Sequence, residues 1–164
     1  MRIFIDADAF PNVIKDIVIR ASMRLNVPLY FVANQHVRVE ESADITIIQV
    51  PAGADVADDR IAELAQPGDL VITADIPLAD RVVTKGALAL DPRGKLYTQD
   101  NIKNSLAMRG LFKELRDGGM MSGGPATYSK TDRQTFANRL DRFLIRQLKI
   151  ESDKSQADHL HQAT

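Results

Sequence analysis

Short apolar runs alternate along the chain with longer segments in which apolar residues recur every three or four positions. Several of the short runs are rich in β-branched residues, which is typical of strands, and the longer segments have the period of an amphipathic helix. The strands predicted in this way cover residues 2–5, 29–32, 45–50, 70–73 and 87–90. Strands that alternate with helices predict an α/β fold whose mostly parallel sheet, of about five strands, is covered on both faces.

Each predicted helix lies between two of these strands or follows the last one. Pro11 stands at the start of the first helix, where its missing N–H group costs nothing, and Gly86 ends the third. Thr131 and Gln134 have capping-box spacing at the start of the last helix. The predicted helices cover residues 11–25, 55–65, 77–86, 99–116 and 132–148. The second half of the chain is therefore predicted to end in a helical region.

The length of 164 residues suits one domain with one core. We expect a single domain over residues 1–150 and a disordered polar tail over residues 151–164, which lack a clear pattern. Four glycines lie between Asp117 and Pro125. They predict a mobile loop that could close over a site.

Composition excludes several classes of site. The chain has no cysteine, which rules out disulfides, thiolate zinc sites and cysteine nucleophiles. Its formal net charge of -1 excludes a globally basic nucleic-acid binder but allows a local basic face. No signal-peptide pattern is present, and no apolar run approaches the roughly 20 residues of a membrane helix. We expect a cytoplasmic protein that does not bind membranes.

Aspartates follow two of the predicted strands at the point where each strand ends. Asp6 and Asp8 come directly after the first strand, Asp75 follows the fourth, and Asp80 lies in the next helix. Sites in such sheets form outside the carboxyl ends of the strands. We therefore expect Asp6 and Asp75 to lie close together. Asp8 and Asp80 could equally be a turn residue and a helix cap.

Three further aspartates begin the predicted middle helix. Asp55 is three positions before Asp58 and four before Asp59, so either pair can share a helix face. Capping explains Asp55 and Asp58 equally well. Clustered carboxylates repel one another, and a hard cation such as Mg²⁺ or Mn²⁺ removes that cost. The predicted metal ligands are Asp6, Asp8, Asp55, Asp59 and Asp75, and the predicted catalytic residues are Asp6, Asp75 and Asp80.

Phosphodiester hydrolysis is the simplest chemistry that combines such a cation with an activated water molecule. Polar residues that could bind the substrate are Asn34 and Gln35 after the second strand, with Arg81, Lys85 and Arg93 as phosphate contacts. The basic residues could equally form a solvated helix surface. Of the aromatic residues, Tyr97 and Tyr128 are predicted to lie in loops, where they could stack on a base.

Several stretches of the chain resemble the YaiI/YqxD family of bacterial proteins. They are residues 5–9, 32–35, 53–59, 69–79, 85–94, 123–125 and 136–141. The resemblance covers nearly the whole chain, to about Leu148. Members of the family commonly carry cysteine where this chain has Phe10, so an essential thiol at that position is excluded here.

The YaiI/YqxD family is in turn similar to the PIN-like and NYN nucleases. That similarity implies a three-layer sandwich and an acidic Mg²⁺ or Mn²⁺ site that cuts RNA. Asp6 then matches the first-strand aspartate of those nucleases, Asp75 the later strand-end aspartate, and Asp80 the fourth acidic position. Two other hypotheses stay open: a non-catalytic module of the same fold that binds nucleic acid or a nucleotide, and a phosphoesterase acting on small esters.

Overall fold

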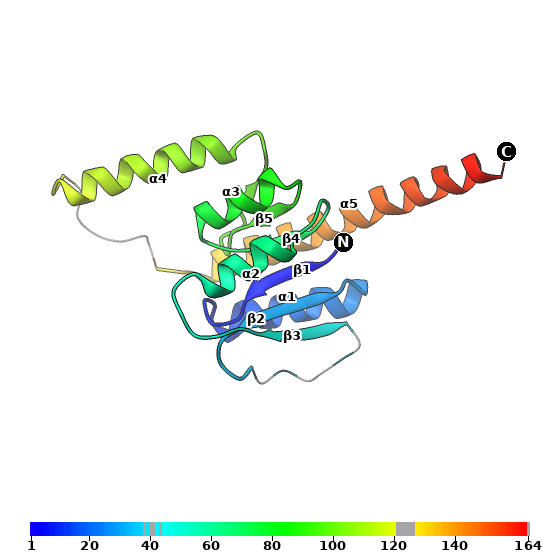
Figure 1. Cartoon of the computed structure of the whole chain (residues 1–164), viewed down its shortest axis with the longest axis horizontal. Coiled ribbons are helices and arrows are strands. Elements are labelled where there is room, and N and C mark those ends of the chain that lie inside the picture. The colour runs from blue at the N-terminus through cyan, green and yellow to red at the C-terminus, as the bar shows by residue number, and fades with distance from the viewer. Residues whose placement is uncertain (38, 40–41, 43, 121–126, 164) are drawn as a thin grey trace.

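The computed structural model describes residues 1–37, 39, 42, 44–120 and 127–163. Gly123–Pro125, and with it most of the predicted glycine-rich loop, lies outside the described residues. The chain forms an α/β fold built on one sheet (Figure 1). This confirms the predicted fold class.

Six strands form the sheet, in the order β3-β2-β1-β4-β5-β6. The first five are parallel, and β6 is antiparallel to β5. The strands are β1 (Ile3–Asp6), β2 (Leu29–Ala33), β3 (Ile45–Gln49), β4 (Leu70–Ile72), β5 (Leu88–Leu90) and β6 (Leu96–Tyr97). The two-residue strand β6 was not predicted. It places Tyr97, predicted to lie in a loop, in the core with only 4% of its surface exposed.

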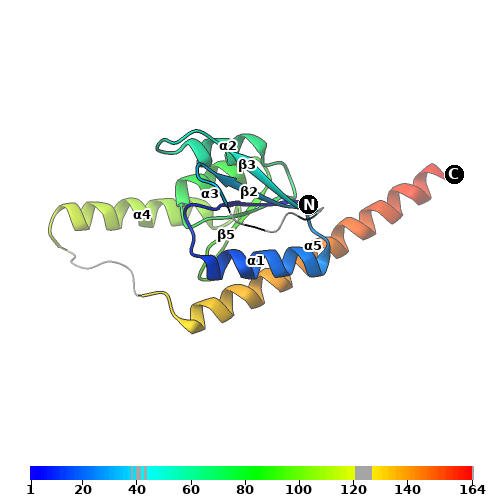
Figure 2. The same ribbon diagram turned by 90° about the horizontal axis from the view of Figure 1, so that it is seen from below.

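Helices cover both faces of the sheet (Figure 2). One face packs against α1 (Asn12–Leu25) and the first half of α5 (Lys130–Gln162), and the other packs against α2 (Val56–Leu64) and α3 (Ile76–Thr84). The side chains of β1 show the division, because Ile3 and Ile5 enter the first core and Phe4 enters the second. The helix α4 (Ile102–Asp117) packs against α3.

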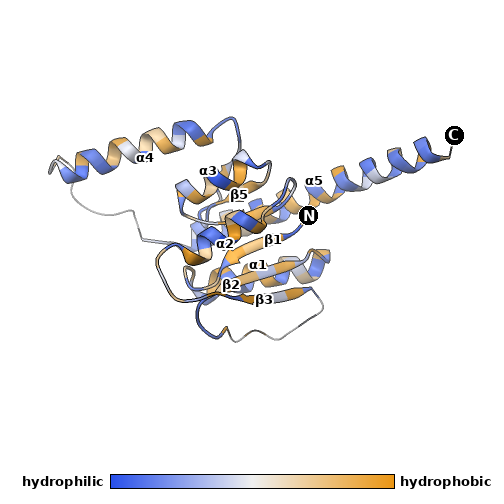
Figure 3. Ribbon diagram, in the orientation of Figure 1, coloured by the Kyte–Doolittle hydropathy of each residue, from blue (hydrophilic) through white to orange (hydrophobic). Residues whose placement is uncertain are grey.

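The last helix differs from its prediction at both ends. Ser129 is its N-cap and forms a capping box with Asp132, so the cap lies before the predicted pair of Thr131 and Gln134. Residues 151–162, predicted as a disordered tail, continue the helix, and this part projects beyond the sheet (Figure 1). The segment contains neither glycine nor proline, so nothing in it breaks a helix. Residues 151–162 are mostly hydrophilic, whereas the central strands are hydrophobic (Figure 3).

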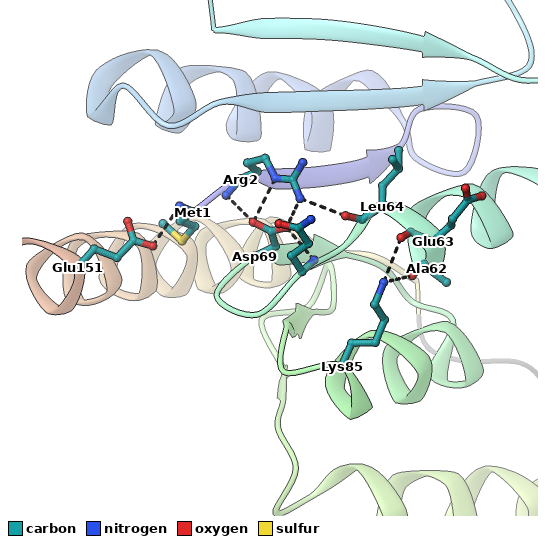
Figure 4. A network of polar contacts seen from close by, with 9 residues as sticks. Met1, Arg2, Ala62, Glu63, Leu64, Asp69, Lys85 and Glu151 are labelled. Atoms are coloured by element: carbon teal, nitrogen blue, oxygen red, sulfur yellow. Dashed lines mark hydrogen bonds and ion pairs between the residues drawn. The ribbon is translucent and has the colours of Figure 1, made fainter. Parts of the chain in front are cut away.

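A polar network joins the start of β1 to the turn before β4 (Figure 4). The buried Asp69 accepts hydrogen bonds from the backbone N–H of Arg2 at 3.0 Å, from Nη2 of Arg2 at 2.7 Å and from the backbone N–H of Gln66 at 2.9 Å. Nη2 of Arg2 also donates to the carbonyl of Leu64 at the end of α2. The network therefore ties two neighbouring strands and one helix together at the edge of the sheet opposite the carboxyl ends of β1 and β4.

In the part of the chain that the structure describes, no helix has the length and hydropathy needed to cross a bilayer.

Candidate functional site

The strand order changes direction between β1 and β4. After β1 the chain crosses through α1 on one face, and after β4 it crosses through α3 on the other. The crevice at the carboxyl ends of two such strands is where α/β sheets of this kind bind ligands. Asp6 ends β1, and Thr73 and Asp75 follow β4, so the chain places polar residues on both sides of this crevice.

Four carboxylates line one small cavity at this edge of the sheet. The cavity has a volume of about 100 Å³, and we call it the acidic cavity. Its acidic residues are Asp6, Asp8, Asp55 and Asp58. Asn34 and the turn after β3 complete its wall. The structure therefore brings together aspartates from the end of β1 and from the start of α2, which are about fifty residues apart in the sequence.

Backbone N–H groups fix two of these carboxylates. Oδ1 of Asp6 accepts the N–H of Asp8 at 3.0 Å, and Oδ2 of Asp8 accepts the N–H of Asn34 at 2.7 Å. The second bond ties the turn after β1 to the end of β2. Oδ1 of Asn34 is buried and has no hydrogen-bond partner among the described residues. A buried amide oxygen without a partner is costly, so it marks a position where a donor from a ligand or water would be favourable.

Helix capping does not account for Asp55. This residue is the N-cap of α2, but its side chain makes no capping hydrogen bond, and its backbone adopts a left-handed conformation with φ of 62°. A left-handed non-glycine residue is uncommon, and such positions cluster at functional sites. By contrast, Oδ1 of Asp75 accepts the N–H of Leu78 at 2.9 Å and caps α3. Helix capping therefore accounts for Asp75, which was predicted as a metal ligand and a catalytic residue.

Repulsion within the cluster is strongest at Asp58. Burial, and after it the charges of Asp75, Asp6, Asp55 and Asp59 in that order, raise the pKa of its carboxyl from 3.8 to about 6. Burial also raises the pKa of Asp6, against the lowering effect of the hydrogen bond from the N–H of Asp8. Both carboxylates are therefore held where their negative charge is unfavourable, which is the condition that a bound cation relieves.

Asp58 is the site residue that sequence reasoning left undecided, because three aspartates begin the same helix. A signal for it exists in the sequence. Asp58 lies three and four positions before Ile61 and Ala62, the two buried residues of α2, so it shares their inward face. Asp59 lies four positions before the exposed Glu63, on the outward face.

Several predicted site residues lie on the outer surface of α2 and α3 instead. Asp59 pairs with Arg81 at 2.7 Å, and Asp80 pairs with Lys103 at 2.9 Å. Nζ of Lys85 donates to the carbonyls of Ala62 and Glu63 at the end of α2. The residues Asp59, Asp80, Arg81 and Lys85 line a shared surface cavity that contains none of the four carboxylates of the acidic cavity.

Asp75 lines neither of these two cavities. Its side chain is exposed, yet of the neighbouring charges that raise the pKa of Asp58, that of Asp75 has the largest effect. Gln35 and Arg93 border two further cavities, of about 590 Å³ and 460 Å³. The second of these also contains Asp91, whose pKa is raised by burial, and Tyr128, whose hydroxyl donates to the carbonyl of Pro92.

The oxygen donors of the acidic cavity suit a hard divalent cation, but they do not form a closed cage. Among the described residues, no group of three or more histidine, cysteine, aspartate or glutamate side chains is arranged to hold a metal ion. Mg²⁺ does not need such a cage, because it is usually held by one or two carboxylates together with water and substrate phosphates. A Mg²⁺ or Mn²⁺ ion at the acidic cavity would therefore have to be held by one or two of its carboxylates together with water and substrate.

Replacing Asp58 with asparagine is expected to stabilise the protein at pH 7.5 in the absence of metal. The pKa of Asp58 is about 6 in the folded protein and 3.8 in the unfolded chain, so the folded state binds the proton more tightly. The stability that this protonation contributes is fully present below pH 3.8. That contribution is lost as the pH rises through about 6. The full shift corresponds to about 3 kcal/mol, and partial exposure reduces the expected gain to about 1 kcal/mol.

Urea denaturation of both proteins at several pH values measures this gain. It should shrink as the pH falls and vanish below about pH 4. Asp59→Asn is the matched control and should give no gain, since Asp59 is exposed and paired with Arg81. A gain for Asp58→Asn that is independent of pH would contradict the electrostatic explanation.

Comparison with known proteins gives the chain its family. The model of the family described as "Uncharacterized BCR, YaiI/YqxD family" matches residues 4–146. A UPF0178 protein of Maridesulfovibrio salexigens is 55% identical over 148 residues, which cover 90% of this chain and 98% of that protein. One from Solidesulfovibrio magneticus is 57% identical over 144 residues, covering 88% and 96%. No solved structure matches the chain. The chain belongs to the YaiI/YqxD family.

Proposed function

We propose that the protein is a divalent-metal-dependent nuclease that hydrolyses phosphodiester bonds, with RNA as its substrate. The observation that carries the proposal is the acidic cavity between the carboxyl ends of β1 and β2 and the start of α2, where burial and mutual repulsion raise the pKa values of Asp58 and Asp6. Titratable groups perturbed by specific neighbours at a ligand-binding edge are typical of catalytic sites. The resemblance to PIN-like nucleases points in the same direction.

Asp6 and Asp58 would hold the cation, because they are the carboxylates whose repulsion it relieves most. Asp8 and Asp55 line the same cavity and could bind the cation through water. A bound Mg²⁺ or Mn²⁺ supplies a polarised phosphoryl oxygen and a water molecule of lowered pKa. A cytoplasmic location, predicted from the sequence, fits an RNA substrate.

The four carboxylates also constrain how the substrate binds. A phosphodiester brings a further negative charge to a cavity that already contains four acidic groups. Binding of the phosphate is therefore unfavourable without a cation, whereas Arg81 and Lys85 lie at another cavity and cannot neutralise this one. Substrate binding and cleavage should both require the metal.

Incubation with labelled single-stranded and double-stranded RNA and DNA tests the proposal. Each substrate is treated with Mg²⁺, Mn²⁺ or EDTA, and cleavage is followed on denaturing gels. We expect cleavage of RNA that needs a metal and stops in EDTA. The nuclease proposal fails if the folded, metal-saturated protein cleaves none of these substrates. If that protein still binds labelled RNA in fluorescence anisotropy, a binding module of the same fold is favoured.

A further inference from the structure

A second cavity adjoins the acidic cavity on the α1 side of the sheet. We call it the α1 cavity, and its volume of about 590 Å³ lies in the range of sites that bind small ligands. Asp8 lines both cavities. A ligand in the α1 cavity could therefore extend past Asp8 to the carboxylates of the acidic cavity.

The α1 cavity has an apolar wall. Phe10, Ile19, Val37 and Val39 line it, and all four are partly buried side chains packed against the hydrophobic core. The core supports these side chains from behind, while part of each surface faces the cavity. Phe10 supplies a phenyl ring to this wall of the α1 cavity. This wall favours a ligand with a flat apolar surface.

The rest of the lining is polar but carries little net charge. Asn12 and Gln35 offer neutral amide groups, His36 adds an imidazole, and the positive charge of Lys15 is set against the carboxylates of Asp8 and Asp16. Nζ of Lys15 also donates to the carbonyl of Ala7 at 3.1 Å. Without an excess of positive charge, the α1 cavity is not built for the anionic part of a ligand. It suits an uncharged group with polar edges.

We propose that the α1 cavity binds a nucleobase, stacked on Phe10 and hydrogen-bonded by the side-chain amides of Gln35 and Asn12. A planar heteroaromatic ring matches both the apolar wall and the neutral polar groups, and amide side chains pair well with base edges. The position of the attached phosphate, beyond Asp8 at the acidic cavity, rests on the proposed nuclease function. Binding of the base does not.

Titration of ¹⁵N-labelled protein with the four ribonucleosides tests base binding, with ribose as the baseless control and no metal present. We expect at least one nucleoside to shift the amide signals of Asn12 and Gln35, and ribose to leave them unchanged. Phe10→Leu keeps an apolar side chain but removes the ring. It should weaken nucleoside binding about tenfold, the scale of one lost base–aromatic stacking contact. Gln35→Ala should weaken it severalfold and change the preference among bases.

Phe112→Ala is the matched control, because Phe112 is 40% exposed on α4, outside the α1 cavity. It should leave nucleoside binding unchanged, and thermal melting checks that each variant is folded. The base site is refuted if no nucleoside binds better than ribose, or if Phe10→Leu and Gln35→Ala both bind nucleosides as the wild type does. If the wild-type protein does not cleave RNA but binds nucleosides in a manner that depends on Phe10, only the nuclease proposal is refuted.

Discussion

Replacing Asp6 with asparagine is expected to reduce metal-dependent RNA cleavage at least about 100-fold and to leave the protein folded. Asp6 ends the central strand, lines the acidic cavity and has a raised pKa. Asparagine keeps an oxygen that can accept the N–H of Asp8, so the turn after β1 is preserved. What it removes is the negative charge that would hold the cation. Initial cleavage rates at saturating Mg²⁺, with melting temperatures for folding, measure the effect.

Two further variants sharpen this test. Asp59→Asn lies one residue from Asp58 but faces Arg81, and it should cleave at close to the wild-type rate. Asp75→Asn retains a good N-cap for α3, so any loss of activity in it reflects its charge near Asp58 and not a loss of fold. If wild type and Asp6→Asn cleave RNA at the same rate, Asp6 does not hold the metal.

Replacing Asp69 with alanine is expected to lower the free energy of unfolding by about 3 kcal/mol. The carboxylate is 4% exposed and accepts hydrogen bonds from Arg2 and from the N–H of Gln66 (Figure 4). Its removal takes the acceptor from the partly buried N–H groups of Arg2 and Gln66, and it frees the guanidinium that also caps α2 through the carbonyl of Leu64. The Arg2 side chain is 29% exposed and can still reach water, which keeps the loss at the lower end of the range for buried pairs.

Urea denaturation compares this variant with Asp141→Ala. Asp141 also pairs with an arginine, Arg24, but both side chains are about half exposed, at 42% and 54%. Solvent screening makes such a pair worth less than about 1 kcal/mol. If the two substitutions cost the same, burial of Asp69 would not be the source of its contribution.

The sheet could be predicted because its inner strands are apolar at nearly every position and are separated by clear turn signals. The first five strands agree with the prediction to within one residue at each end. The strand β6 was missed because Leu96 and Tyr97 are too few to show an alternating pattern. They form a strand only by pairing with Leu90 and Ala89, which is a tertiary contact.

The site was predicted in outline and not in detail. Asp6, Asp8 and Asp55 could be placed at one edge because the carboxyl ends of parallel strands and the starts of the following helices share that edge. The division of roles between Asp58 and Asp59 depends on the rotation of α2 about its axis, which is set by the burial of Ile61 and Ala62. The ion pairs of Asp59 with Arg81 and of Asp80 with Lys103, which lie outside the acidic cavity, depend on packing between α2, α3 and α4. Local sequence carries no sign of those contacts.

The position of β1 in the middle of the sheet has a consequence for how the chain folds during synthesis. Ile3 pairs with Leu29 on one side but with Leu70 on the other. Apart from Asp6 this strand is apolar, and one of its edges therefore has no partner until residues 70–72 have left the ribosome. Contacts so distant in sequence slow folding, and an open apolar strand edge invites aggregation meanwhile. Fragments that end before β4 will lack a closed central strand and will not fold as independent units.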